Sequence, residues 1–297
     1  MEFSYHSLQE IVEMAENRGM RLSDLVLMEQ ANVLECSQKD VLDRMSEQYA
    51  VMKNAELRGQ EKDVKSTSGL TGGDAYKIKK AMEENRTLSG PFLAGALMRA
   101  TAISEYNAAM GKIVAAPTAG SCGILPAALI TMEEEKGVSE EDCVRALLTA
   151  SAVGMVIANN ASIAGAEGGC QAECGAASAM AAAAIVELSG GTPTQCAHAV
   201  AIALKNIMGL VCDPVAGLVE IPCVKRNSSG VANAIVAAEL VLCGVKSAIP
   251  VDEVIEAMAE VGNKMDVSLK ETAEGGLANT TTAKLLCRKV FACKERD

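Results

Sequence analysis

The sequence predicts an all-α fold, in which buried, alanine-rich helices are joined by loops rich in glycine and proline. Of the 297 residues, 49% are hydrophobic but only 2% are aromatic and none is Trp, so small and aliphatic side chains must fill the core. Small side chains at the contact let helices pack closely together. Signals that start and stop helices recur along the chain. Few stretches alternate between polar and apolar residues as a half-buried strand does.

The first helix is predicted directly after the N-terminus. Ser7 and Glu10 have the spacing of a capping box. The apolar residues that follow at helical spacing are Leu8, Ile11, Val12 and Ala15. Farther along, Ser139 and Asp142 predict another helix start. The apolar positions of that helix are Val144, Leu147 and Leu148.

Three more helices are predicted in the second half of the chain. Residues 176–188 are nearly all Ala, Met, Ile and Val, which is typical of a helix buried on every side. Thr192, Pro193 and Gln195 supply an N-cap, a first-turn proline and a capping-box partner for a helix through Met208, which Gly209 should end. Pro250 should start a helix that Gly262 stops. Its inward positions are Val254, Ile255 and Met258.

We expect a polar N-terminal helical segment over residues 1–65 and a more apolar body over residues 66–297, which forms one continuous helical unit. The stretch 59–68 is polar and without periodicity, so it is the best candidate for a linker. No internal repeat is present.

Charge and hydropathy exclude several classes of protein. The net charge of −11 offers no basic stripe for nucleic acid. The first residues have neither the basic nor the apolar region of a secretion signal. Apolar runs such as 176–188 are too short to span a bilayer. We therefore expect a cytoplasmic protein without nucleic-acid or membrane partners.

Three of the eleven cysteines lie in loops rich in glycine and proline: Cys170, Cys212 and Cys223. Because a residue before proline avoids the α region, Asp213 and Ile221 should be extended and the thiols should project from an irregular loop. Three thiolates without a fourth partner would hold a metal centre with one open coordination position. From spacing alone Cys174, one helical turn from Cys170, is an equal competitor.

The kind of metal follows from the ligand types. The chain has only two His residues, so soft thiolate ligands without imidazole point to zinc or an iron–sulfur cluster, and an exchangeable position favours the cluster. Most other cysteines lie in helical patterns and read as small buried apolar residues. These are Cys36, Cys143, Cys196, Cys243 and Cys287. Cys293 near the C-terminus is either a displaceable ligand or part of a frayed tail.

Two glycine-rich loops, 68–74 and 117–126, can turn backbone N–H groups and hydroxyls toward one anion. A substrate carboxylate or a phosphate would fit there. Neither loop matches a nucleotide-binding fingerprint, so a nucleotide is disfavoured, and ordinary tight turns are the alternative. Asn159 is a polar residue in an apolar stretch and either binds a ligand or caps a helix. Lys205 lies on an apolar helix that runs into the Cys212 loop. It is a base, a carboxylate clamp or a surface lysine.

Four runs of sequence together resemble the α chain of the two-chain, iron–sulfur-dependent bacterial L-serine dehydratases. They are Ser-Gly-Leu-Thr-Gly-Gly from residue 68, Pro-Thr-Ala-Gly-Ser-Cys-Gly from 117, Ala-Glu-Gly-Gly-Cys-Gln-Ala-Glu from 166, and the run from Gly209 to Cys223. The resemblance covers essentially the whole chain. It implies an all-helical catalytic domain with a [4Fe–4S] cluster on Cys170, Cys212 and Cys223. It is the resemblance that favours these residues over Cys174 and Cys122.

The resemblance also implies the reaction, in which L-serine gives pyruvate and ammonia. An iron without a protein ligand acts on the serine hydroxyl as a Lewis acid while a base removes the α-proton. The substrate would be held by Ser68, Gly69, Thr71, Thr118, Ala119, Gly120, Ser121 and Asn159. Lys205 is a candidate base. A β chain with an ACT-like domain is the expected partner in an oligomer, and it could instead supply or position the base.

One departure from the family pattern concerns the C-terminal region, where Thr280-Thr281-Thr282-Ala283 replaces the usual Thr-Pro-Thr-Gly. Three other functions are weighed beside serine dehydration. Cysteine desulfidation would use the same elimination chemistry, and pyridoxal phosphate on Lys205 would catalyse it without iron. A non-catalytic iron–sulfur sensor would need no loops for a carboxylate.

Overall fold

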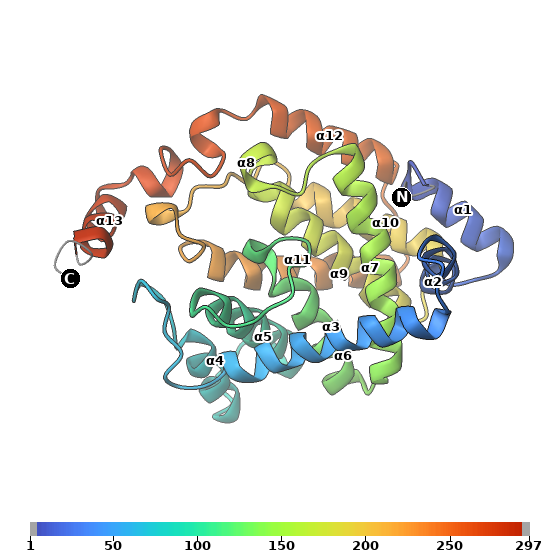
Figure 1. The fold of residues 1–297 in the computed structure, drawn as a ribbon, viewed down its shortest axis with the longest axis horizontal. Coiled ribbons are helices and arrows are strands. Elements are labelled where there is room, and N and C mark those ends of the chain that lie inside the picture. The colour runs from blue at the N-terminus through green and yellow to red at the C-terminus, as the bar shows by residue number, and fades with distance from the viewer. Residues whose placement is uncertain (1–4, 293–297) are drawn as a thin grey trace.

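The structure is a computed structural model that describes residues 5–292, with thirteen α-helices and no β-strand in this part of the chain. This confirms the predicted all-α fold (Figure 1). The helices are α1 (Leu8–Arg18), α2 (Leu22–Val33), α3 (Gln38–Gly59), α4 (Asp74–Glu83), α5 (Gly90–Ala108), α6 (Ile124–Lys136), α7 (Glu140–Asn160), α8 (Gly165–Gly168), α9 (Ala176–Leu188), α10 (Pro193–Ile207), α11 (Cys223–Leu242), α12 (Val251–Lys264) and α13 (Thr281–Ala292).

The alanine-rich helix α9 lies at the centre of the molecule. Every residue from Ala176 to Glu187 is buried, as the uniform apolar pattern predicts. Helices α6, α7, α10 and α11 pack around it, and Figure 1 shows α9 enclosed between them. Because alanine adds so little bulk, several helices can approach one axis at once.

The N-terminal helices belong to the same hydrophobic core as the rest of the chain. Buried residues from Leu8 to Met52 and from Ala96 to Met258 form one cluster. Helix α1 packs on α10, α2 on α7, and α3 on α5. The loop after α3 begins where a linker is expected, but both sides of it share a core. The division at residue 65 stays a prediction.

The predicted helix caps are confirmed. The Ser7–Glu10 and Thr192–Gln195 capping boxes are both present. The Ser139 hydroxyl accepts a hydrogen bond from the Asp142 N–H. Helix α12 begins after Pro250 but continues past Gly262 to Lys264. A Cβ atom at Gly262 would lie 3.0 Å from Gly168 Cα, so this glycine permits close packing on α8 instead of ending the helix.

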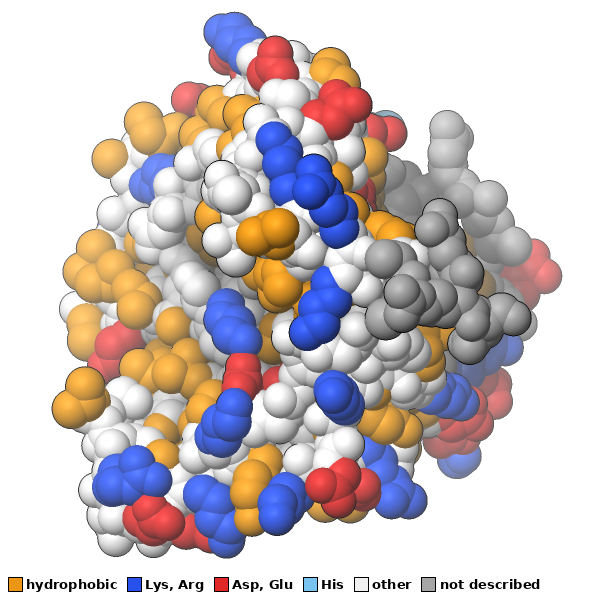
Figure 2. Space-filling model, turned by 90° about the vertical axis from the view of Figure 1, so that its left-hand side faces the viewer, with side chains coloured by type: hydrophobic (Ala, Val, Ile, Leu, Met, Phe, Trp, Pro, Cys, Tyr) orange, Lys and Arg blue, Asp and Glu red, His pale blue; other side chains and the backbone are white. Residues whose placement is uncertain are grey.

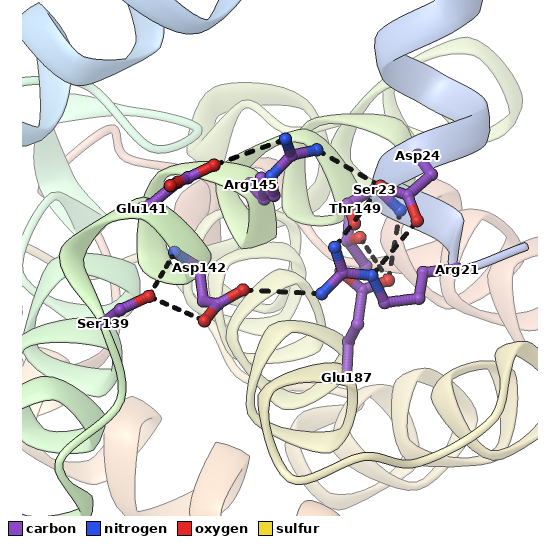
Figure 3. A network of polar contacts seen from close by, with 9 residues as sticks. All are labelled: Arg21, Ser23, Asp24, Ser139, Glu141, Asp142, Arg145, Thr149 and Glu187. Carbon is purple, nitrogen blue, oxygen red and sulfur yellow. Dashed lines mark hydrogen bonds and ion pairs between the residues drawn. The ribbon is translucent and has the colours of Figure 1, made fainter.

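A buried polar network ties the N-terminal helices to the body (Figure 3). The Glu187 carboxylate at the end of α9 accepts hydrogen bonds from the Ser23 N–H and the Thr149 hydroxyl. Nearby, Arg145 on α7 forms an ion pair with Asp24 on α2. Among residues 5–292 no helix is long and apolar enough to cross a membrane.

Candidate functional site

Four cysteine thiols from separate parts of the chain meet beside the start of α9. Cys170 follows α8, Cys174 lies in the π-helical turn Gln171–Gly175, Cys212 follows α10, and Cys223 is the first residue of α11. All four side chains are buried. The Sγ atoms of Cys170 and Cys174 are 3.4 Å apart. Hydrogen bonds from the thiols of Cys174 and Cys212 hold the pKa of Cys170 well below its usual value.

The turn that carries Cys170 depends on the glycine before it. Gly169 has a φ of +75°, and a Cβ atom there would lie 2.6 Å from the sulfur of Met265. Only glycine adopts this conformation at such a close approach without strain. The chain then enters a π-helical turn, a feature common at functional sites. The Gln171 amide ties this turn to the Cys212 loop, because its Oε1 accepts from the Gly209 N–H at 2.8 Å.

The segment at Cys212 is extended and held on both sides. Its N–H donates to the Leu269 carbonyl at 2.8 Å, and its carbonyl accepts from the Glu271 N–H at 2.8 Å. Arg226 of α11 donates to the Val211 carbonyl and to Asp213 Oδ1, both at 2.8 Å. The Arg226 guanidinium also contributes to the lowered pKa of Cys170. It therefore places positive charge beside the thiols.

Glu173 places a carboxylate among the thiols. Its Oε2 atom is 4.0 Å from Cys212 Sγ, and its Oε1 atom accepts a hydrogen bond from the Thr118 hydroxyl at 2.8 Å. A Cβ atom at Gly165 would lie 2.8 Å from Glu173 Oε2 and 3.0 Å from Cys212 Sγ, so glycine leaves room for this contact. Burial raises the pKa of Glu173 to about 7. A carboxylate in this setting can exchange a proton near neutral pH.

The first glycine-rich loop, residues 68–74, contacts the 209–223 segment through Glu220. The hydroxyls of Ser68 and Thr71 both donate to Glu220 Oε2 at 2.9 Å. Gly69 lies between them with a φ of +76°. Glu220 itself is buried and lies three positions before Cys223. The loop over Ser68, Gly69 and Thr71 is thus joined to the 209–223 segment, which carries Cys212 and Cys223.

The second glycine-rich loop reaches the same site through Asn227 of α11. The Asn227 amide donates to the carbonyls of Gly120 at 2.7 Å and Cys223 at 2.9 Å. Thr118 contacts Glu173, and the hydroxyls of Thr118 and Ser121 are 3.1 Å apart. Ala119 lies between them in a short 3₁₀ turn. The structure therefore brings both predicted loops to the cysteines.

Two predicted site residues lie apart from this cluster. Asn159 is exposed near the end of α7, and no hydrogen bond of its side chain is found among the described residues. Lys205 is exposed on α10, where its Nζ atom donates to the Ser247 hydroxyl at 2.8 Å. This position favours the reading of Lys205 as a surface lysine.

Sequence reasoning missed the polar side chains that join the cysteines to the loops: Glu173, Glu220, Arg226 and Asn227. Glu173 and Glu220 both lie within sequence runs that carry the family resemblance. Each is a charged residue in an apolar or glycine-rich run, and that contrast is the signal that would have pointed to them.

The donor set suits an iron–sulfur cluster. Within the part of the chain that the structure describes, no group of three or more His, Cys, Asp or Glu side chains is arranged around a point where one metal ion would bind. The side chains that meet here are thiols without imidazole, the donor type of most iron–sulfur clusters. Their burial beside a guanidinium also fits an anionic cluster.

Of the five cysteines predicted to be buried in helices, Cys143 and Cys196 are buried in the core, Cys36 and Cys287 are partly exposed, and the prediction is wrong for Cys243, which is exposed at the end of α11. The thiol of Cys143 contacts the Leu129 carbonyl, and that of Cys196 contacts the Ala183 carbonyl. Cys122 is fully buried in a small cluster with Ala55 and Ile103. Cys293 lies outside the described residues.

The chain resembles proteins whose names state an activity. Residues 17–278 match the family model described as serine dehydratase alpha chain. The chain is 49% identical over 287 residues to the probable L-serine dehydratase, alpha chain, of Bacillus subtilis, covering 97% of this chain and 95% of that protein. It is 43% identical over 292 residues to the L-serine dehydratase, alpha chain, of Peptoniphilus asaccharolyticus, covering 98% and 99%. L-serine dehydratase TdcG of Escherichia coli is 37% identical over 288 residues, which cover 93% of this chain but 62% of that protein. The chain therefore belongs to the serine dehydratase alpha chain family.

Proposed function

We propose that this chain is the catalytic subunit of an L-serine dehydratase, which converts L-serine to pyruvate and ammonia with a [4Fe–4S] cluster. The observation that carries the proposal is the convergence of buried thiols with two hydroxyl-bearing loops and a buried carboxylate. The names of the relatives supply the substrate.

In this proposal Cys170, Cys212 and Cys223 hold the cluster, and Arg226 balances part of its charge. When bound, the cluster supplies a Lewis acid that makes the serine hydroxyl a better leaving group. The loop over Thr118, Ala119, Gly120 and Ser121 holds the substrate beside the thiols. Loss of the α-proton and of the hydroxyl gives 2-aminoacrylate, which tautomerises and is hydrolysed to pyruvate and ammonia.

Glu173 is the proposed acceptor of the α-proton. Its carboxylate contacts both Cys212, a proposed cluster ligand, and Thr118 of the substrate loop. A general base must lie within reach of the proton that it removes. Replacement of Glu173 by Gln keeps the shape of the side chain but removes the base, so kcat should fall about 10²- to 10⁴-fold while the iron content stays unchanged. A variant that retains kcat would exclude Glu173 as the base.

The proposed partner is a β chain with an ACT-like domain. Relatives named alpha chain from B. subtilis and P. asaccharolyticus are covered almost completely by this chain. It spans only 61–62% of relatives from Streptomyces coelicolor and E. coli that are named simply L-serine dehydratase. A second chain would supply the remaining part, so we expect an oligomer of both. A cytoplasmic, reducing location would keep the thiols available for a cluster.

The proposal is tested by measuring iron, acid-labile sulfide and pyruvate formation on one anaerobic preparation of the chain with its partner. About four iron and four sulfide per chain are expected, together with pyruvate from L-serine. A preparation that contains iron but forms no pyruvate would contradict the enzymatic part of the proposal. A preparation that binds no iron would contradict the ligand assignment.

A further inference from the structure

We propose that Glu220, with the hydroxyls of Ser68 and Thr71, forms the binding site for the α-ammonium group of the substrate. The inference rests on the proposed function for the identity of the substrate and deepens it. It assigns the recognition of the amino group to a residue in the loop between two proposed cluster ligands.

The contacts of Glu220 are unusual for a buried acid. Its side chain is only 4% exposed. Both hydroxyls donate to the same oxygen, Oε2, at 2.9 Å. The other oxygen, Oε1, accepts no hydrogen bond from any described residue. Oε1 is not fully enclosed, so this oxygen can accept a hydrogen bond from a ligand.

Glu220 also has no cationic partner in the described residues. The buried carboxylates of Glu56 and Asp213 lie next to Arg99 and Arg226. No Lys, Arg or His nitrogen between residues 5 and 292 lies within ion-pair distance of Glu220. Because an unpaired buried charge is costly, this carboxylate is suited to a cation brought by a ligand.

The direction of the hydrogen bonds decides which end of an amino acid fits here. A hydroxyl has one proton, and Ser68 and Thr71 both use theirs on Glu220. Their oxygens then present only lone pairs, and the Ser68 oxygen already accepts from the Leu70 N–H at 3.0 Å. An ammonium group donates three hydrogen bonds, which the Glu220 carboxylate and the hydroxyl oxygens can accept. These three side chains offer a substrate carboxylate no donor, so it must bind to other groups.

The loop is accessible from a hollow in the molecular surface. Gly69, Leu70 and Thr71 line a cavity of about 430 Å³, with Lys65 and Lys225 on its walls. Figure 2 shows Lys and Arg side chains spread over this side of the molecule. Asp63 and Asp74 also line this cavity, whereas Glu220 does not, so Thr71 is the member of the proposed site that the cavity exposes.

The chain contains a matched control for a buried carboxylate of this type. Glu187 is 8% exposed and accepts from the Thr149 hydroxyl and the Ser23 N–H. Figure 3 shows Ser23 of α2 and Thr149 of α7 beside it. Cys196 of α10, which is not a proposed cluster ligand, also lies near it. Replacing Glu187 by Gln therefore changes a similar network without changing the proposed site.

The test compares two ligands that differ only in the amino group. L-alanine and L-lactate have no β-hydroxyl, so neither undergoes the elimination. Their binding to the full chain is measured by titration calorimetry, and KM and kcat for L-serine are measured on the iron-loaded enzyme with its partner. The variants are Glu220→Gln, Ser68→Ala and the control Glu187→Gln, each checked for iron content and thermal unfolding.

In the unmodified chain, L-alanine should bind roughly 10- to 100-fold more tightly than L-lactate, the value of hydrogen bonds to a charged group. Glu220→Gln should abolish this preference and raise the KM for L-serine roughly 10- to 100-fold, while kcat falls much less. Ser68→Ala should show a smaller loss in the same direction. Glu187→Gln should keep the preference and the KM.

Two results would overturn the inference. One is an unchanged preference for L-alanine in a folded Glu220→Gln variant. The other is an equal loss of affinity for both ligands, because a purely structural tie between the loops would act on both alike. The calorimetric arm needs no turnover. A chain that binds L-alanine through Glu220 but forms no pyruvate would disprove the proposed function and leave the ammonium site standing.

Discussion

At the scale of single residues, Cys170 and Cys174 show what spacing cannot decide. Both thiols enter the site, 3.4 Å apart. Cys170 shares a hydrogen bond with Cys212 and lies near Arg226. Cys174 lines a cavity of about 390 Å³ with residues of the 206–210 segment and with Arg226. The choice of Cys170 over Cys174 as a ligand therefore rests on the family resemblance.

Replacing Cys212 by Ser should abolish both iron binding and pyruvate formation, because a cluster cannot be held by two remaining thiolates. Cys174→Ser should keep the iron, and so should Cys143→Ser, a control in the core far from the loops. Iron and sulfide content after anaerobic reconstitution measure this directly. Retention of a full cluster by the Cys212 variant, or its loss from the Cys174 variant, would show that the ligand set is different.

A second residue-scale prediction concerns Glu56 of α3. Burial raises its pKa to about 7 from about 4.5, even though Arg99 Nε lies 3.6 Å from its carboxylate. Between about pH 4.5 and pH 7 the folded chain keeps the Glu56 proton that the unfolded chain has released. The free energy of unfolding therefore falls as the pH rises through this range. Gln at this position cannot ionise.

Relative to Glu56→Gln, the native chain should lose about 1 kcal/mol of unfolding free energy between pH 6 and pH 8. Urea unfolding at the two pH values measures the difference. Glu47→Gln, at an exposed position of the same helix, should show no such change. A Glu56 difference that is constant with pH would mean that the carboxylate is already ionised throughout.

At the scale of helices and loops, the sequence predicted the features that depend on residues close together in the chain. The capping boxes, the buried helix α9 and the irregular loop around Cys212 follow from residues within a few positions of one another. The contacts of Glu220 with Ser68 and Thr71 join residues about 150 positions apart. Such contacts depend on how α5 and α11 pack, which no local pattern specifies. Gly262 is a second example. The sequence predicted a helix end there, whereas the structure shows that this glycine allows close contact with Gly168.

The packing of α3 on α5 yields a prediction about one of these long-range contacts. A Cβ atom at Gly59 would lie 2.0 Å from the Ala102 carbonyl oxygen, which belongs to the backbone and cannot turn away. Gly59→Ala should therefore lower the unfolding free energy by roughly 1–3 kcal/mol, the usual cost of overpacking. The comparison is Gly175→Ala, whose Cβ atom would meet its nearest neighbour at 3.8 Å.

The Gly175 substitution should leave stability nearly unchanged. Thermal and urea unfolding of both variants give the measurement. Equal stability of Gly59→Ala and the native chain would mean that α3 and α5 can separate without cost at this crossing.

At the scale of the whole molecule, the fold gathers four distant loops at one side of a helical body. The loops after α3, α5, α8 and α10 carry the hydroxyls and thiols, whereas most of the core lies in the helices; Cys170, Cys174 and Cys212 are the site residues that belong to it. Figure 1 shows the segment around Cys212–Cys223 and the loop after α3 on the side where α13 lies. The site thus borders the core, and most of the packing that keeps the chain folded is separate from it.

This separation predicts the response to oxygen. An iron without a protein ligand is exposed to oxidants, so air should remove iron, sulfide and activity from the proposed enzyme while the helices stay packed. Activity and circular dichroism are followed in the same aerated sample, and unfolding is measured at its end. Activity should disappear with the ellipticity unchanged, and anaerobic iron and sulfide should restore it. Activity that survives prolonged aeration with an iron chelator would contradict a labile cluster. Parallel loss of ellipticity would mean that the cluster supports the fold, which the continuous core of α9 and its neighbours argues against.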